Sequence, residues 1–282
     1  MTPPSISDSA HDQGDYASLS QPRRRFLGRT AIDIWETLSG LASLAFLCII
    51  TACTKAPAHS ARLGPGIRRQ IALSGVNLLP WATLLSAGLG LVVVGQMLGV
   101  FTGLGAPQYL GAILVSTVVH ELGPIVVGVL VLSIAGTATV IELGTHRVLP
   151  ASHSQTHPAR DTLRQIVLPR VIGFGFATLC LAIYFITLTL LFAYLIVFLQ
   201  NAPLTPDAFI TNIADALTWE SFVLLVVKAF GFGAIIGVVA CYEGYLRPIS
   251  LEQLSRATIR TVVEGIILCG LVDSLSITYL LL

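Results

Sequence analysis

The sequence contains few charged residues. Asp, Glu, Lys and Arg together make up 11% of its 282 residues, and hydrophobic residues make up 54%. A soluble domain carries about 25% charged residues. The stretch from 71 to 119 contains no Asp, Glu, Lys, Arg or His at all. This composition excludes an ordinary soluble domain and predicts an integral membrane protein. Because the net charge is only +1, nothing in it indicates a nucleic-acid partner.

The sequence also lacks the motifs of soluble enzymes. It has no Gly-Lys-Ser/Thr phosphate loop, no nucleophile elbow and no His-Glu-x-x-His motif. The five cysteines form no Cys-x-x-Cys pair, and no His/Cys spacing matches a metal site. We therefore interpret the cysteines as small buried hydrophobic residues. No enzyme activity, metal or cofactor is expected, so any ATP hydrolysis must belong to a partner subunit.

The N-terminal part is polar before it becomes apolar. Residues 1–22 are rich in Ser, Asp, Pro and Gln and predict a disordered cytoplasmic tail. In the region 23–61, an apolar segment from about 34 to 53 follows three arginines. The Arg-Arg-x-Phe-Leu pattern and Cys53 allow an export signal as an alternative. An amphipathic helix at the membrane surface fits better, because more membrane segments follow rather than a secreted domain.

The apolar stretches predict five transmembrane helices. A single helix over 71–119 would be roughly 70 Å long, more than twice the hydrocarbon thickness of about 30 Å. It must therefore be two spans, with the Gly- and Pro-rich segment 103–107 as the turn. The expected spans are 71 to that turn, the next from there through about Ile141, then Val171 to about Gln200, Phe222–Tyr242 and Thr261–Leu282.

Basic residues give the expected orientation. They flank the first apolar segment on both sides and recur in 142–170 and 244–260, whereas 102–108 and 200–219 contain none. The positive-inside rule then places the N-terminus in the cytoplasm and the C-terminus in the periplasm, and the first segment does not cross. The predicted fold class is an all-α integral membrane protein with an N-terminal interfacial amphipathic helix and five transmembrane helices.

Small residues recur at intervals of four in two spans. Gly95, Gly99 and Gly103 form a Gly-x-x-x-Gly-x-x-x-Gly ridge, and Gly233 and Gly237 repeat the spacing in the fourth span. Such ridges allow the backbones of two helices to approach closely. Packing within one chain and packing between two chains both remain open.

A few ionisable residues fall inside the predicted spans. Glu121, Lys228, Glu264 and Asp273 are of this kind, and His120 lies beside Glu121. A charge near the bilayer centre costs about 2.5–3.5 kcal/mol on insertion scales, so these groups should face the interior of the bundle. Glu121, Lys228 and Asp273 come from three spans, and a pair or triad among them would join those helices. They form either a structural ion pair or the polar lining of a path for a lipid headgroup.

Two further features concern the helix backbone and its ends. Pro124 follows Gly123 within a span and is expected to break or kink the helix next to a cavity. Arg256 and Arg260 begin the last span, where they can signal topology or contact lipid phosphate. Arg260 and Glu264 are four residues apart and can form a local ion pair.

The motifs in combination resemble the MlaE/YrbE permease family over residues 62–282. They are Glu121-Leu-Gly-Pro124, Ala135-Gly-Thr-Ala138, Glu142-Leu-Gly144, Leu168-Pro-Arg170 and the segment 255–263. The residues that carry the resemblance are Gly123, Pro124, Gly136, Glu142, Gly144, Pro169, Arg170, Arg256 and Arg260.

The resemblance implies a permease subunit of an ABC system in a bacterial inner membrane. In such a system two permease subunits, identical or different, enclose a phospholipid cavity. Cytoplasmic ATPases bind below, and an MCE-domain protein docks on the periplasmic side. The family's polar membrane residues match Glu121, Lys228 and Asp273, with His120 where an arginine is usual.

Two departures from the family pattern affect the predicted coupling to ATP. Leu132-Ser-Ile134 stands where Ala-Gly-Arg is usual, and Pro150-Ala151 stands where a Glu-Gln-containing helix normally docks on the ATPase. Coupling is then lost or moves to a shorter helix near 160–165. The candidate residues of this loop are Arg147, Arg160 and Arg164.

Three functions follow from these observations. The first is an ATP-coupled phospholipid permease, and the second is a membrane anchor for an MCE-domain protein without transport or ATP coupling. An ion or proton channel is the least favoured, because few polar residues line any single span.

Overall fold

The computed structural model describes residues 37, 39–48, 50, 60–105, 113–148, 166–199, 210–211, 213–215, 217–247 and 253–281. Within these ranges the regular elements are helices and no strand occurs. The chain divides after Ser43 into two units. The helix packing described below belongs to the second unit, Leu44–Leu282.

Five helical segments in the described ranges are long and apolar enough to cross a membrane, so the chain is a multi-pass membrane protein. The segments are Gly64–Phe101, Val115–Thr145, Leu168–Leu199, Trp219–Leu246 and Leu254–Thr278. A shorter apolar helix covers Ser39–Cys48. These ten described residues extend about 15 Å at 1.5 Å per residue, half of what a crossing requires. The predicted fold class, with five spanning helices after a shorter apolar helix, is confirmed.

The first spanning segment contains a break that the sequence pattern did not predict. Helix α2 (Ser60–Ser74) is followed by a 3₁₀ turn (Val76–Leu78) before α3 (Leu79–Gly103) begins. The amide of Gly75 donates to the carbonyl of Ile71 at 2.8 Å. A side chain at Gly75 would collide with that same carbonyl. The end of α3 agrees with the predicted turn, because Gly105 has a φ of 68°, a conformation that glycine readily adopts.

Pro124 does not interrupt its helix, so the break, one of the two predicted outcomes, does not occur. A stretch of wide π-helical turns (Val115–Leu122) continues directly into α5 (Gly123–Val131). The amide of Gly123 donates five residues back to Val118 rather than four. Pro124 stands at the start of α5, where a missing N–H is tolerated. A second π-helical stretch (Leu132–Gly136) leads into α6 (Thr137–Val148).

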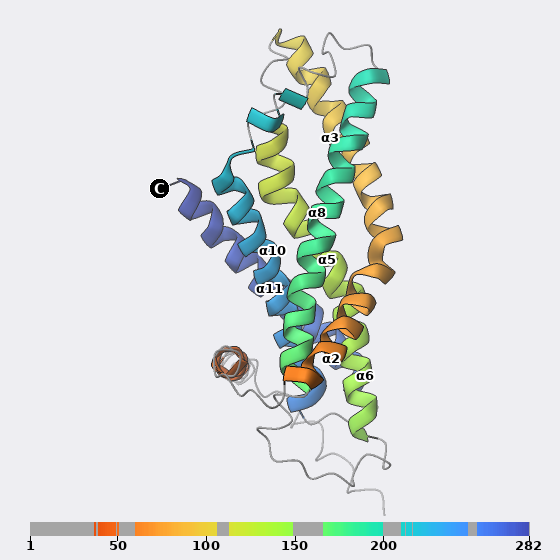
Figure 1. Cartoon of the computed structure of the whole chain (residues 1–282), viewed down its shortest axis with the longest axis vertical. Coiled ribbons are helices and arrows are strands. Elements are labelled where there is room, and N and C mark those ends of the chain that lie inside the picture. The colour runs from red at the N-terminus through yellow and green to blue at the C-terminus, as the bar shows by residue number, and fades with distance from the viewer. Residues whose placement is uncertain are drawn as a thin grey trace, which may run out of the picture. The chain divides into compact units, whose positions relative to one another are not determined.

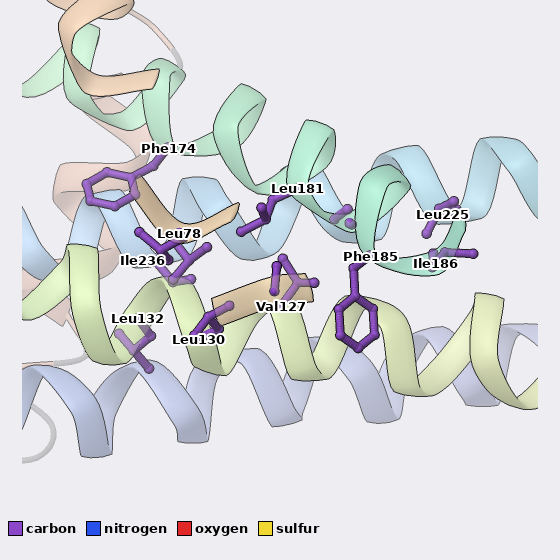
Figure 2. Packing of buried hydrophobic residues seen from close by; sticks show 14 of the residues in the cluster. Leu78, Val127, Leu130, Leu132, Phe174, Leu181, Phe185, Ile186, Leu225 and Ile236 are labelled. Carbon is purple, nitrogen blue, oxygen red and sulfur yellow. The ribbon is translucent and has the colours of Figure 1, made fainter. Parts of the chain in front are cut away.

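Helix α8 (Leu168–Leu199) is central to the packing of the second unit. It contacts α2, α3, α5 and α10 (Trp219–Cys241) (Figure 1). Its side chains Phe174, Leu181 and Phe185 are buried in the main hydrophobic cluster (Figure 2). After α10, a π-helical stretch (Tyr242–Leu246) ends the fourth span, and α11 (Leu254–Leu281) packs against α10 and α6.

The two glycine ridges have different surroundings. A Cβ added at Gly233 would collide with the backbone of α8 at Phe174, and one at Gly237 would lie 2.8 Å from Cα of Val171. This ridge therefore allows α10 and α8 to cross closely within one chain. By contrast, a Cβ at Gly99 or Gly103 would meet no atom within 4 Å. Helix α3 packs closely on α8 at a different position, Gly90.

Candidate functional site

The predicted intramembrane charges form a triad. The ammonium Nζ of Lys228 lies 2.5 Å from Oδ1 of Asp273 and 3.2 Å from Oε2 of Glu121. The Lys228 side chain is 2% exposed, whereas those of Asp273 and Glu121 are 14% and 33% exposed. The structure thus brings together three residues from three different spans, as the cost of isolated charges in a membrane predicts.

The triad lies at one depth in the bundle. At 1.5 Å per residue, Lys228 is about 14 Å from the start of α10 and Asp273 about 12 Å from the end of α11. Glu121 lies in the π-helical stretch at the start of the second span. These helix ends are on the side of the loops 102–108 and 200–219, which contain no basic residues. The basic segments 142–170 and 244–260 belong to the opposite side. On all three spans the triad therefore lies nearer to this end of the helix than to the other end.

Pro124 contributes to this site through the backbone. Proline has no N–H, so it cannot donate to the carbonyl of His120 four residues earlier. That carbonyl accepts a hydrogen bond from Nζ of Lys228 at 2.8 Å. The helix irregularity thus supplies a third oxygen for a buried ammonium, which has three donors. The imidazole of His120 has both ring nitrogens buried without a hydrogen-bond partner among the described residues.

An apolar pocket adjoins the triad. It has a volume of about 120 Å³ and lies between α5, α10 and α11. Ile125, Leu132, Phe232 and Ile266 contribute apolar walls, and Asp273 contributes the charged group. Leu132, one of the residues that depart from the family pattern, is 1% exposed. The pocket offers an apolar chain a site next to buried charges.

A second charged cluster lies at the other end of the second span. Oε1 of Glu142 accepts a hydrogen bond from Nη2 of Arg170 at 3.2 Å and lies 3.3 Å from Nη2 of Arg69. The motif residues Glu142 and Arg170 are therefore ion-pair partners, which their spacing of 28 residues did not predict. Arg69 was predicted only as part of a basic flank. Its position on α2, which contacts α8, brings it to the same carboxylate.

A third charged cluster surrounds Glu264 and adds Arg247 to it. Oε1 of Glu264 lies 4.0 Å from Arg247, and Arg247 also pairs with Glu243 at 2.5 Å. Arg260, four residues before Glu264, is exposed on α11, and its charge also acts on Glu264. Glu243 is fully buried and was missed by the sequence analysis. The sequence feature that could have revealed it is the spacing of four residues between Glu243 and Arg247 at the end of the fourth span.

The motif glycines mark close contacts between helices. A Cβ at Gly123 would lie 2.6 Å from Ile186, one at Gly136 3.4 Å from Ile236, and one at Gly144 2.5 Å from Leu254. Pro169 fills the space beside Gly66, where a Cβ would lie 3.3 Å away. These residues therefore pack the bundle and do not line the triad.

Other predicted site residues lie at or beyond the edge of the described part. Arg256 is exposed near the start of α11. Arg147 belongs to the last turn of α6. Arg160, Arg164 and the departure at 150–151 lie outside the described residues. Among the residues that the structure does describe, no group of three or more His, Cys, Asp or Glu side chains is placed to hold a metal ion.

Comparison with known proteins gives a consistent result. A model of the permease family MlaE matches residues 67–278. A probable ABC transporter permease of Rickettsia typhi is 26% identical over 90% of this chain and 96% of its own length. The intermembrane phospholipid transport system permease protein MlaE of Haemophilus influenzae is 25% identical over 85% of this chain and 90% of its own.

A similarity over a smaller part of the chain extends to a plant protein. The chloroplastic protein TRIGALACTOSYLDIACYLGLYCEROL 1 of Arabidopsis thaliana is 28% identical over 71% of this chain and 57% of its own length. The family match covers all five spanning segments almost completely. The chain belongs to the MlaE permease family and is a transporter subunit rather than an enzyme.

Proposed function

We propose that this chain is the permease subunit of an ABC-type phospholipid transport system in a bacterial inner membrane. The observation that carries the proposal is the position of the Lys228 triad beside an apolar pocket that ends at Asp273. A phospholipid joins a charged headgroup to apolar chains, so it needs both kinds of surface next to each other. Family membership and the printed name of the Haemophilus influenzae relative support the same substrate.

The polar residues of the triad have a defined role in this proposal. Glu121 and Asp273, whose side chains are 33% and 14% exposed, give the polar surface that faces the headgroup, and the buried Lys228 balances their charge inside the membrane. His120 adds an imidazole whose ring nitrogens have no hydrogen-bond partner among the described residues. Polar groups buried in a membrane are costly and commonly mark a substrate path.

A second permease subunit, identical or different, completes the lipid cavity in this proposal. Support comes from α3 and α11, which bury little of their apolar surface within the chain. Exposed apolar side chains on these helices include Val92, Val100, Ile267, Leu271 and Leu275. The open space beside Gly99 and Gly103 would let a partner helix approach α3 closely.

The proposed topology follows the distribution of basic residues. The N-terminal tail, 1–22, and the loop between α6 and α8 face the cytoplasm, and the C-terminus faces the periplasm. Residues 23–61 lie at the membrane surface, and 62–282 form the permease domain. An ABC ATPase binds on the cytoplasmic side, through the loop that carries Arg147, Arg160 and Arg164. An MCE-domain protein binds on the periplasmic side.

A second candidate function is a membrane anchor for an MCE-domain protein without ATP coupling. The feature that favours it is Pro150-Ala151 in the loop where the family's coupling helix would lie. Proline interrupts a helix, so a regular docking helix is not expected at this place.

Purification of the full chain from its native host in mild detergent tests both functions. Mass spectrometry of the eluate should identify an ABC ATPase, an MCE-domain protein and retained phospholipid. A matched preparation in which a Gly/Ser linker replaces residues 145–165 should lose the ATPase and keep the lipid. An eluate with the MCE-domain protein but without the ATPase would instead support the anchor. Absence of phospholipid from every preparation would contradict a lipid path.

A further inference from the structure

We propose that the pocket between α2, α6 and α8 is a phosphate-binding site, separate from the Lys228 triad and from the proposed lipid path. The ligand is a tetrahedral phosphate oxyanion, which either a lipid headgroup or free phosphate can supply. This inference goes beyond transport, because it concerns the opposite end of the bundle. It rests on the contacts of Arg69, Glu142 and Arg170.

The pocket has a volume of about 150 Å³ and is lined by charged and polar side chains. Arg69 and Gln70 come from α2, Glu142 from α6 and Arg170 from α8. The Arg170 side chain is 16% exposed and is held in place by Glu142 through Nη2. Its other terminal nitrogen, Nη1, is buried without a hydrogen-bond partner among the described residues. A buried guanidinium nitrogen of this kind is costly unless a ligand or water accepts its hydrogen bond.

The charges in the pocket do not balance. Two guanidinium groups share a single oxygen, Oε1 of Glu142, at 3.2 and 3.3 Å. Among the described residues that line the pocket, one positive charge therefore remains in excess. A guanidinium has five N–H donors in a planar fork that suits phosphate. A phosphate oxyanion would balance the charge, and a rotation of the Arg170 side chain would let it accept a hydrogen bond from the unpaired nitrogen.

The surroundings of the pocket suit the surface of a membrane. Leu73 and Ile166 give it apolar walls, and Leu73 is 41% exposed. The Arg69 side chain is 70% exposed, so the guanidinium can reach an incoming anion. The pocket lies on the side of the basic loops, where positive pockets between spans attract anionic headgroups. Gln70 is occupied with Ser74 at 2.7 Å, so it shapes the wall.

Glu142 distinguishes a ligand site from a structural ion pair. If the three side chains only hold the helices together, replacing the carboxylate can only weaken the cluster. If the pocket binds an anion, Glu142→Gln removes a competing negative charge and strengthens binding. Arg69→Gln and Arg170→Lys should weaken binding of the anion, whether it is a lipid headgroup or free phosphate. Arg68→Gln is the matched control, because Arg68 is the neighbouring exposed residue on α2 and does not line the pocket.

The lipid arm of the test uses the full chain in nanodiscs of phosphatidylcholine with increasing phosphatidylglycerol. Native mass spectrometry measures the phosphatidylglycerol retained by each variant. We expect the apparent affinity to fall by about tenfold in Arg69→Gln and Arg170→Lys, the usual effect of losing a charge-assisted hydrogen bond. It should rise in Glu142→Gln and stay unchanged in Arg68→Gln.

The second arm uses inorganic phosphate on the same chain in pure phosphatidylcholine nanodiscs, with ionic strength held constant by chloride. A rise in unfolding temperature that needs Arg69 and Arg170, without selective retention of phosphatidylglycerol, identifies free phosphate as the ligand. If phosphatidylglycerol is retained and inorganic phosphate does not displace it, the ligand is a lipid headgroup. The proposal is overturned if wild type, Arg69→Gln and Arg68→Gln behave alike in both arms, or if Glu142→Gln weakens binding. Arg69 is exposed, so its replacement is not expected to prevent folding.

Discussion

The two charged clusters at opposite ends of the second span differ in charge and in burial. The Lys228 triad has one cation between two carboxylates, and its lysine is almost completely buried. The Glu142 cluster has one carboxylate between two guanidiniums, and one of these is largely in solvent. Burial sets how much each contact contributes to stability, whereas the excess charge sets which ligand can bind. The first cluster should therefore control folding and the second should control anion binding.

The largest effect is expected for Lys228→Met. This change leaves Glu121 and Asp273 without their cation inside the membrane, and removing one partner of a buried ion pair costs about 3–5 kcal/mol. The unfolding temperature of the purified chain in one detergent should fall sharply, with poor recovery from the membrane.

The matched control is the triple variant Lys228→Met, Glu121→Gln, Asp273→Asn. Because no charge is then left unpaired, most of the lost stability should return. If the triple variant is as unstable as Lys228→Met, packing of the lysine stem rather than charge explains the effect.

A smaller loss is expected for Asp273→Asn. Lys228 keeps Glu121 at 3.2 Å and the His120 carbonyl at 2.8 Å, so the ammonium is still paired. The loss of one charged contact costs about 1–3 kcal/mol. Thermal unfolding should place this variant between wild type and Lys228→Met; an unfolding temperature below that of Lys228→Met would contradict the assigned role of the lysine.

Arg170→Gln tests the partly buried member of the other cluster. The change removes one hydrogen bond to Glu142 and also the unpaired nitrogen, so the cost should be about 1–2 kcal/mol. The unfolding temperature should fall less than in Asp273→Asn. A loss as large as that of Lys228→Met would mean that both clusters hold the fold to the same degree.

The smallest effect is expected for Arg69→Gln. A solvent-exposed ion pair contributes about 0–1 kcal/mol, so unfolding should be almost unchanged and equal to that of Arg68→Gln. Added salt should remove any difference between the two variants. A clear loss that persists in high salt would show that Arg69 is more important to packing than its exposure indicates.

The sequence predicted the spans and the triad for a physical reason. Lipid offers no hydrogen bonds, so long uncharged stretches and the few interrupting charges are both informative. The pairing around Glu142 was not predictable in the same way. Several arginines occupy that side of the membrane, and only the rotation of α2 against α8 selects Arg69. The break at Gly75 was also missed, although Gly75 and Pro80, the second residue of α3, mark it in the sequence.

The π-helical stretches explain another limit of the sequence pattern. Each wide turn holds one residue more than an α-turn, so every side chain beyond it is rotated by about 100°. The side of the helix that Glu121 presents therefore cannot be obtained from a regular period of 3.6 residues. The same applies to Glu243, which lies in the π-helical end of the fourth span.

These wide turns also have a consequence for how the length of the spans can vary. A one-residue deletion in a regular helix turns every following side chain to a new direction. A deletion within Val115–Leu122, Leu132–Gly136 or Tyr242–Leu246 instead converts a wide turn into an ordinary one. Single-residue gaps in alignments with relatives are therefore expected at these three places, and each gap marks a change in which side chains face the bundle.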